Sequence, residues 1–224
     1  MIPPRSSRSL RLERELEPNG PPTRAWVLYL LVGTNTLVEV VLLLSDLGLI
    51  EPRLRSLAYE YGAFWAGLLT NWRPNFPWQP ATMFLTYGFL HAGFWHLSVN
   101  MLTLASLGSG IVLRVGQRHF LRLYVVSLLG GALCFGLLVS TPQPMMGASG
   151  ALFGLAAAWL IGEFFDEVQQ RRWRHLILQV LILAGMNLIL WWAMDGHLAW
   201  QAHLGGFMAG GFYAVGLWGL ERFR

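Results

Sequence analysis

Long apolar segments dominate the chain, and their lengths give the first structural prediction. A helix needs about 20 predominantly apolar residues to cross a bilayer. Segments close to that length cover about residues 26–44, 96–113, 120–139, 145–162, 176–194 and 201–220. The pattern predicts an all-α polytopic membrane protein, a bundle of six transmembrane helices with both termini on the same side of the membrane.

The composition agrees with a membrane protein and argues against other classes. Of the 224 residues, 54% are hydrophobic and only 12% are charged, whereas soluble domains carry about 25% charged residues. The net charge of +4 does not indicate a nucleic-acid partner, because the basic residues lie at the ends of the predicted helices and form no stripe with interleaved aromatic residues. The single cysteine, Cys134, cannot form an internal disulfide.

The distribution of arginine predicts the orientation in the membrane. Residues 1–25, 114–122, 163–174 and 221–224 together contain thirteen arginines, and the other side of the predicted bundle has three, Arg53, Arg55 and Arg73. Basic residues are enriched in cytoplasmic connections. We therefore expect both termini in the cytoplasm, and we expect the protein in a bacterial inner (plasma) membrane.

The same pattern divides the chain into three regions. Residues 1–25 mix Arg, Glu and Pro in a composition that buries no core, so we expect a cytoplasmic, largely disordered tail. Residues 26–220 form the predicted membrane domain, and residues 221–224 form a short cytoplasmic tail. No small-residue cleavage site follows the first apolar segment, so we expect that helix to be retained. Residues 45–95 are rich in aromatic residues, and we expect a long interfacial loop, half-embedded in the outer interface.

Ser149 stands out because small residues surround it. Glycine and alanine on both sides remove side-chain bulk, so another backbone, such as a substrate strand, can approach its hydroxyl group. Alternatively, Gly150 and Gly154 form a small-residue face by which membrane helices pack. His203 is the candidate base, because serine is a weak nucleophile unless a neighbouring group takes its proton.

His96 and Asn100 supply candidate hydrogen-bond donors. They lie four residues apart, so a helix places both side chains on one face. With the amide of Ser149 they are suited to hold the oxyanion of a tetrahedral intermediate. The alternative is an interhelical hydrogen-bonding pair that only stabilises the bundle. In the predicted topology His96, Ser149 and His203 all lie near helix starts on the outer side.

These motifs resemble those of the rhomboid intramembrane serine proteases. The resemblance extends over about residues 50–215 and rests on Gly147-Ala148-Ser149-Gly150, Phe89-Leu90-His91, His96-x-x-x-Asn100 and Ala202-His203-x-Gly205-Gly206-x-x-x-Gly210. It implies six helices, a water-accessible site below the outer surface, and cleavage of membrane-spanning substrates without metal or cofactor. It also implies that Ser149 is the nucleophile and His203 the base, with His96 and Asn100 in the oxyanion hole.

The chain departs from the family pattern at several positions. Val112 occupies the place of an acidic residue found in many members, and Phe153 occupies the place of a tyrosine that packs against the catalytic histidine in some. Phenylalanine is still able to stack but donates no hydrogen bond. Thr82 and Met83 replace a tryptophan–arginine pair.

Two other groups of polar residues need an interpretation. Asp195 and His197 precede the last helix, and we expect them in a solvated loop and not in a triad. Glu39 lies within the first helix, so we expect it to face the interior or the interface, with Asn35 one turn earlier as a candidate partner.

The sequence therefore predicts an intramembrane serine endopeptidase that cleaves transmembrane proteins with Ser149 and His203. The alternative is a rhomboid-like pseudoprotease that binds transmembrane helices without cleaving them, although such relatives usually lack the serine or the histidine, and both are present here. A transporter is disfavoured, because the sequence contains no inverted repeat and no paired broken helices.

Overall fold

The computed structural model describes residues 25–139, 142–167, 173–193, 195 and 197–222. Most of the two predicted tails, residues 1–24 and 223–224, lies outside this part of the chain. Within the described residues the regular structure is all-helical, and the strand-like pairing is limited to one antiparallel bridge between Phe64 and Met145. The predicted all-α class is confirmed.

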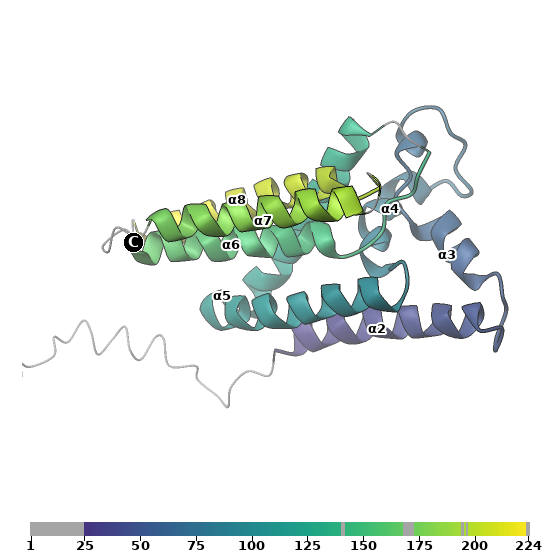
Figure 1. Cartoon of the computed structure of the whole chain (residues 1–224), viewed down its shortest axis with the longest axis horizontal. Coiled ribbons are helices and arrows are strands. Elements are labelled where there is room, and N and C mark those ends of the chain that lie inside the picture. Colours follow the sequence, from purple (N-terminus) through teal and green to yellow (C-terminus); the bar gives the residue numbers. More distant parts are fainter. Residues whose placement is uncertain (1–24, 140–141, 168–172, 194, 196, 223–224) are drawn as a thin grey trace, which may run out of the picture.

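Among the described residues, five long helices form the body of the molecule (Figure 1). They are α2 (Trp26–Asp46), α5 (Phe94–Leu138), α6 (Ser149–Glu167), α7 (Trp173–Ala193) and α8 (Trp200–Arg222). α5 is interrupted at Gly116, whose φ of 74° and ψ of 165° are outside the helical region. Glycine adopts these angles without steric cost. α5 therefore consists of two helices in succession, and the predicted connection at 114–122 is helical except at this residue.

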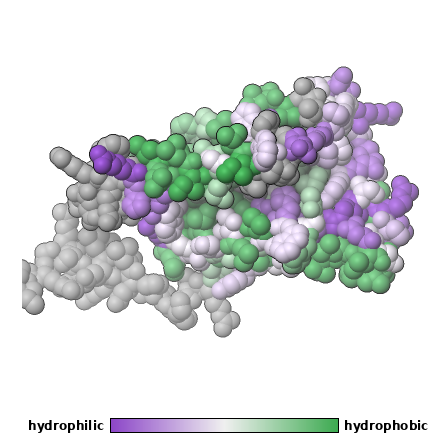
Figure 2. Space-filling model, in the orientation of Figure 1, coloured by the Kyte–Doolittle hydropathy of each residue, from purple (hydrophilic) through white to green (hydrophobic). Residues whose placement is uncertain are grey.

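Two of these helices are long and apolar enough to cross a membrane, α2 and α5, with shorter apolar stretches at Ser149–Phe164 and Ile177–Ile189 in the part of the chain described. Large apolar side chains on the outer faces of these helices are exposed, for example Leu113 and Leu188. Figure 2 shows broad apolar areas along the helices and hydrophilic residues mostly toward the two ends. This surface suits contact with lipid more than contact with water.

Small residues bring α6 and α8 into close contact at the centre of the fold. A Cβ atom added to Gly206 of α8 would overlap the carbonyl oxygen of Gly150 in α6, and one added to Gly210 would lie 2.5 Å from the Cα of Gly154. Glycine at these positions lets backbones approach closely. The prediction that Gly206 and Gly210 bring the last helix close to the serine helix is confirmed.

The chain between α2 and α5 forms short helices at one end of the bundle (Figure 1). They are α3 (Leu54–Gly62), the 3-10 helix η1 (Ala66–Leu69), α4 (Gln79–Thr86) and the 3-10 helix η2 (Tyr87–Phe89). Phe64 is fully buried and packs edge to face on Phe84, Tyr87 and Phe135. This aromatic cluster fastens the segment to the second half of α5.

Candidate active site

Ser149 and His203 face each other where α6 and α8 begin. Ser149 is the first residue of α6, and His203 lies in the first turn of α8. The distance from His203 Nε2 to Ser149 Oγ is 2.8 Å, which is a hydrogen bond. His203 is buried and Ser149 is half-buried. The close packing of α6 and α8 thus joins two polar residues that are 54 positions apart in the sequence.

The segment before Ser149 is extended, which corrects the predicted start of this helix at Met145. Met145 and Phe64 exchange two backbone hydrogen bonds of 2.9 Å, and the Gly147 N–H donates to the carbonyl oxygen of Tyr87 at 2.9 Å. Gly147 has a φ of 116°, a conformation that favours glycine. Because the helix begins only at Ser149, the Ser149 amide lies at the helix N-terminus, where N–H groups have no intrahelical acceptor.

His96 lies beside the same short segment. A Cβ atom placed on Gly147 would be 2.9 Å from His96 Nε2 and 4.0 Å from Ser149 Oγ, so the two side chains flank one small space above this glycine. The N–H of Ala92 donates to His96 Nδ1 at 3.2 Å. In the neutral ring the proton is therefore on Nε2, the nitrogen that faces this space.

Asn100 is buried one helical turn after His96, and its Nδ2 donates to the His96 carbonyl oxygen at 2.8 Å. Its Oδ1 has no hydrogen-bond partner among the described residues. Asn100 therefore supports the turn that carries His96, and its second N–H group is not used in that bond. Unlike His203, Asn100 makes no hydrogen bond to Ser149 in the described part of the chain.

Two side chains fix the ring of His203. Phe153, one turn after Ser149, stacks on the imidazole with ring centroids 4.3 Å apart and an interplanar angle of 6°. The stacking expected of phenylalanine at this position is confirmed. At the ring edge that faces away from Ser149, His203 Nδ1 lies 2.6 Å from Oδ1 of Asn187 in α7. One ring nitrogen thus faces Ser149, and the other faces an amide oxygen.

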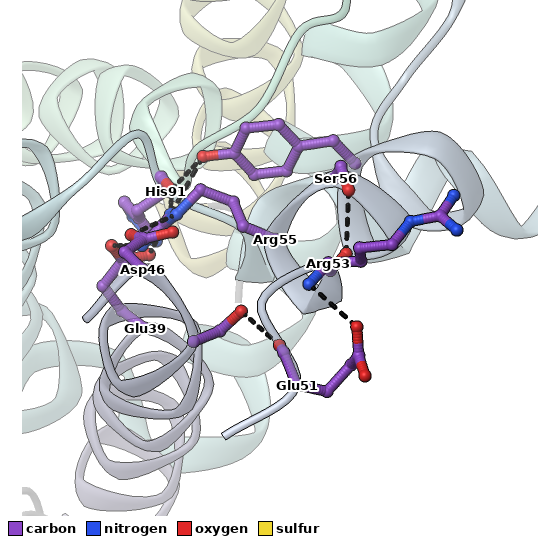
Figure 3. Close-up of polar contacts among 9 residues, drawn as sticks. Glu39, Asp46, Glu51, Arg53, Arg55, Ser56 and His91 are labelled. Atoms are coloured by element: carbon purple, nitrogen blue, oxygen red, sulfur yellow. Dashed lines mark hydrogen bonds and ion pairs between the residues drawn. The ribbon is translucent and has the colours of Figure 1, made fainter. Parts of the chain in front are cut away.

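A buried ion pair connects α2 to α3 near the start of α5 (Figure 3). Arg55 Nη2 contacts Glu39 Oε1 at 2.9 Å, and its Nε contacts Asp46 at 2.7 Å. Arg55 Nη1 and the Tyr59 hydroxyl group both donate to the His91 carbonyl oxygen, at 3.0 and 2.7 Å. These hydrogen bonds connect α3 to His91. The next residue, Ala92, donates its N–H to the His96 ring.

The predicted interior position of Glu39 is confirmed, since its side chain is fully buried. Its expected partner was wrong: Asn35 Nδ2 donates to Leu31 O in its own helix at 2.8 Å, and the carboxylate pairs with Arg55. An arginine reaching in from α3 satisfies a buried carboxylate better than an amide does, because it neutralises the charge.

The polar environment alters two groups in α3. Burial lowers the pKa of the Arg55 guanidinium, but its hydrogen bonds to Glu39, Tyr59 and Asp46 outweigh that effect and raise the pKa above its usual range. Burial also raises the pKa of the Tyr59 hydroxyl group. Arg55 is therefore always cationic and Tyr59 always a donor at physiological pH.

The positions that depart from the family pattern have ordinary structural roles. Val112 and Met83 are buried in the apolar core.

Asp195 and His197 are exposed, as expected of a solvated loop. In the described residues, no group of three or more His, Cys, Asp or Glu side chains is placed to hold a metal ion.

Sequence reasoning missed Asn187 and Arg55. Both had a usable signal: Asn187 interrupts an apolar run that is long enough to span a membrane, and Glu39 in an apolar helix requires a cation nearby. The sequence alone did not show that Asn187 contacts His203 or that Arg55 contacts Glu39.

The fold and the site together define a helical membrane protein with a hydrogen-bonded serine–histidine pair at the starts of two tightly packed helices. The chain belongs to the rhomboid family, because the family model for the Rhomboid domain matches residues 77–220, more than half of the chain. The resemblance inferred from the motifs is confirmed. Family membership and the apolar helices make this a multi-pass membrane protein.

Curated relatives come from several kinds of organism. The chain is 33% identical over 138 residues to Rhomboid protein 1, mitochondrial, of Saccharomyces cerevisiae, covering 56% of this chain and 38% of the relative. It is 31% identical over 135 residues to Rhomboid protease GluP of Bacillus subtilis, covering 59% and 25%. It is 31% identical over 131 residues to Rhomboid-type serine protease 2 of Emericella nidulans, covering 58% and 25%. The chain spans well under half the length of these relatives.

Proposed function

We propose that this chain is an intramembrane serine endopeptidase that cleaves transmembrane proteins. The observation that carries the proposal is the 2.8 Å hydrogen bond between Ser149 Oγ and His203 Nε2. A serine that only packs helices has no need of a histidine that is stacked on Phe153 and hydrogen-bonded at its second ring nitrogen. The names of two relatives, a rhomboid protease and a rhomboid-type serine protease, support the same activity.

In the proposed reaction, Ser149 Oγ attacks the carbonyl carbon of the scissile peptide bond while His203 Nε2 accepts the hydroxyl proton. The resulting imidazolium returns this proton to the leaving amine as the C–N bond breaks, which leaves an acyl ester on Ser149. Water then attacks the ester, and His203 again takes and returns a proton. The reaction needs no metal ion and no cofactor.

The oxyanion formed in each step needs donors on the side of Gly147. The Nε2–H of His96 faces this space, and the Ser149 amide lies at the N-terminus of α6. Asn100 completes the proposed oxyanion hole through the N–H that it does not use on the His96 carbonyl. A good oxyanion donor contributes about 3 to 4 kcal/mol of transition-state stabilisation.

The arrangement in the bilayer is part of the proposal. α2, the two halves of α5, α6, α7 and α8 would each cross the membrane, which gives six crossings and cytoplasmic termini. Residues 45–95 would lie in the outer interface. Assignment to a bacterial inner membrane stays a prediction, because the relatives include mitochondrial and plant proteins.

Reconstitution with a model transmembrane substrate tests the proposal. Wild type should release two fragments, and Ser149→Ala and His203→Ala should release none while still retaining the substrate in co-purification. The matched control is Ser109→Ala, which removes a hydroxyl group from an exposed position in α5 and should cleave like wild type. If wild type retains several transmembrane substrates and cuts none, the chain is a rhomboid-like pseudoprotease.

A further inference from the structure

His203 has a second polar partner, on a helix that carries none of the residues assigned so far. Its Nδ1 lies 2.6 Å from Asn187 Oδ1 in α7. An amide oxygen only accepts hydrogen bonds, so the ring must donate through Nδ1–H. The neutral imidazole then carries its proton on Nδ1 and presents a lone pair at Nε2. Nε2 is the atom that lies 2.8 Å from Ser149 Oγ.

The position of Asn187 on α7 makes this contact specific. Its neighbours Met186, Leu188 and Ile189 are exposed apolar side chains, and α7 packs mainly against α6. A polar side chain in an apolar helix costs free energy unless it is hydrogen-bonded. Asn187 is half-buried, and its Oδ1 accepts the hydrogen bond from His203 Nδ1, at the ring edge that faces away from Ser149.

The geometry points to Asn187 as a positioning residue for the reaction, the third member of a hydrogen-bonded series Ser149–His203–Asn187. It acts through His203: it selects the tautomer whose Nε2 accepts the serine proton, and it holds the imidazolium that forms as Oγ attacks. Phe153 fixes the plane of the ring by stacking, and Asn187 fixes its rotation within that plane. This inference rests on the proposed peptidase function, in which His203 is the base.

A consequence concerns α7 itself. Because the acceptor comes from α7, a displacement of this helix away from α8 removes the hydrogen bond at Nδ1 and releases the ring. Formation of a competent base is therefore coupled to the position of α7 relative to His203. An asparagine in α6 or α8 would give no such coupling.

The kinetic test compares two replacements of nearly equal size. Asn187→Leu keeps the approximate shape of the side chain and removes the hydrogen-bond acceptor. Asn187→Asp replaces the amide by a carboxylate, which accepts hydrogen bonds and donates none. For a model transmembrane substrate, Asn187→Leu should lower kcat about 10- to 100-fold with little change in KM, because loss of orientation acts on the chemical step. Asn187→Asp should restore most of that loss. The control Leu188→Ala truncates the next, exposed side chain and should match wild type.

Some kinetic results would overturn the inference. It fails if Asn187→Leu keeps the wild-type kcat, or if the aspartate and leucine variants are equally impaired at equal thermal stability, since a purely structural role gives that result. Failure of the proposed peptidase function is distinguishable from failure of this inference, because wild type itself then cleaves nothing.

A spectroscopic measurement on the wild-type protein does not depend on activity. Histidine nitrogen NMR of the wild-type protein with ¹⁵N-labelled histidine distinguishes the protonated ring nitrogen from the unprotonated one, and His203→Gln assigns the signal by its loss. We expect a neutral His203 protonated at Nδ1. A neutral ring protonated at Nε2 would mean that the Asn187 amide donates to it, and the positioning role would be wrong.

Discussion

The buried contact between Glu39 and Arg55 gives the sharpest prediction about stability. The Glu39 side chain is 0% exposed and that of Arg55 is 18% exposed. Arg55→Leu leaves a carboxylate inside the bundle without its cation, and breaking a buried pair in this way costs about 3 to 5 kcal/mol. The lost contact to Asp46 adds little, because that side chain is 41% exposed and exposed pairs contribute about 0 to 1 kcal/mol. A loss of this size is a large fraction of a typical domain stability of about 5 to 15 kcal/mol.

A double-mutant cycle separates the pair from the side chains that form it. Glu39→Leu combined with Arg55→Leu removes both charges, so the double variant should be more stable than Arg55→Leu alone. Arg53→Leu is the matched control, because Arg53 is an exposed arginine just before α3 and its loss should change stability by about 0.5 kcal/mol or less. Reversible unfolding in mixed micelles measures wild type, Glu39→Leu, Arg55→Leu, the double variant and the Arg53→Leu control. Additive losses, or an Arg55→Leu variant as stable as Arg53→Leu, would refute the reasoning.

Three further predictions concern the oxyanion hole, acid stability and topology. Asn100→Ala should lower the cleavage rate about 10- to 1000-fold without unfolding the bundle, because His96 and the Ser149 amide remain as donors; a full rate in the purified variant would make Asn100 structural only. Burial lowers the pKa of His91, which lies between η2 and α5, to about 3, so the folded state binds fewer protons than the unfolded state, and stability is lost as pH falls below about 6.5. His91→Phe should remove about 2 to 3 kcal/mol of the stability difference between about pH 7 and pH 4.5, and an unchanged difference would contradict this. In a Cys134→Ala background, Arg118→Cys should be labelled only from the cytoplasm and Asn71→Cys only from outside; labelling of both from one side would contradict the proposed topology.

The helix boundaries were predictable because apolar length controls them. The structure has α2 at Trp26–Asp46 and α8 at Trp200–Arg222, within two residues of the predicted segments 26–44 and 201–220. The start of α6 was predicted four residues early. Met145 is apolar and suits a helix by composition, but it pairs with Phe64, 81 positions away, and only the fold shows such a partner.

The candidate site was predictable as a set of residue types and less so as a set of contacts. Ser149 and His203 were recognisable from their small neighbours, and the structure joins them by one hydrogen bond. Glu39 was recognisable as an interior acid, but Arg55 as its partner depends on how α3 folds back onto α2. Asn187 lies opposite a ring edge that no spacing rule relates to residue 203.

The central claim is that Ser149 is an activated nucleophile, and covalent labelling tests it most directly. A serine reacts readily with a fluorophosphonate probe only when a base takes its proton, so a serine that packs helices stays inert. In detergent, the wild-type protein should carry the adduct on the peptide that contains Gly147–Gly150, Ser149→Ala should carry none, and His203→Ala should carry almost none at nearly unchanged thermal stability. A folded wild-type protein that takes up no probe, or a His203→Ala variant labelled as fast as wild type, would contradict the account.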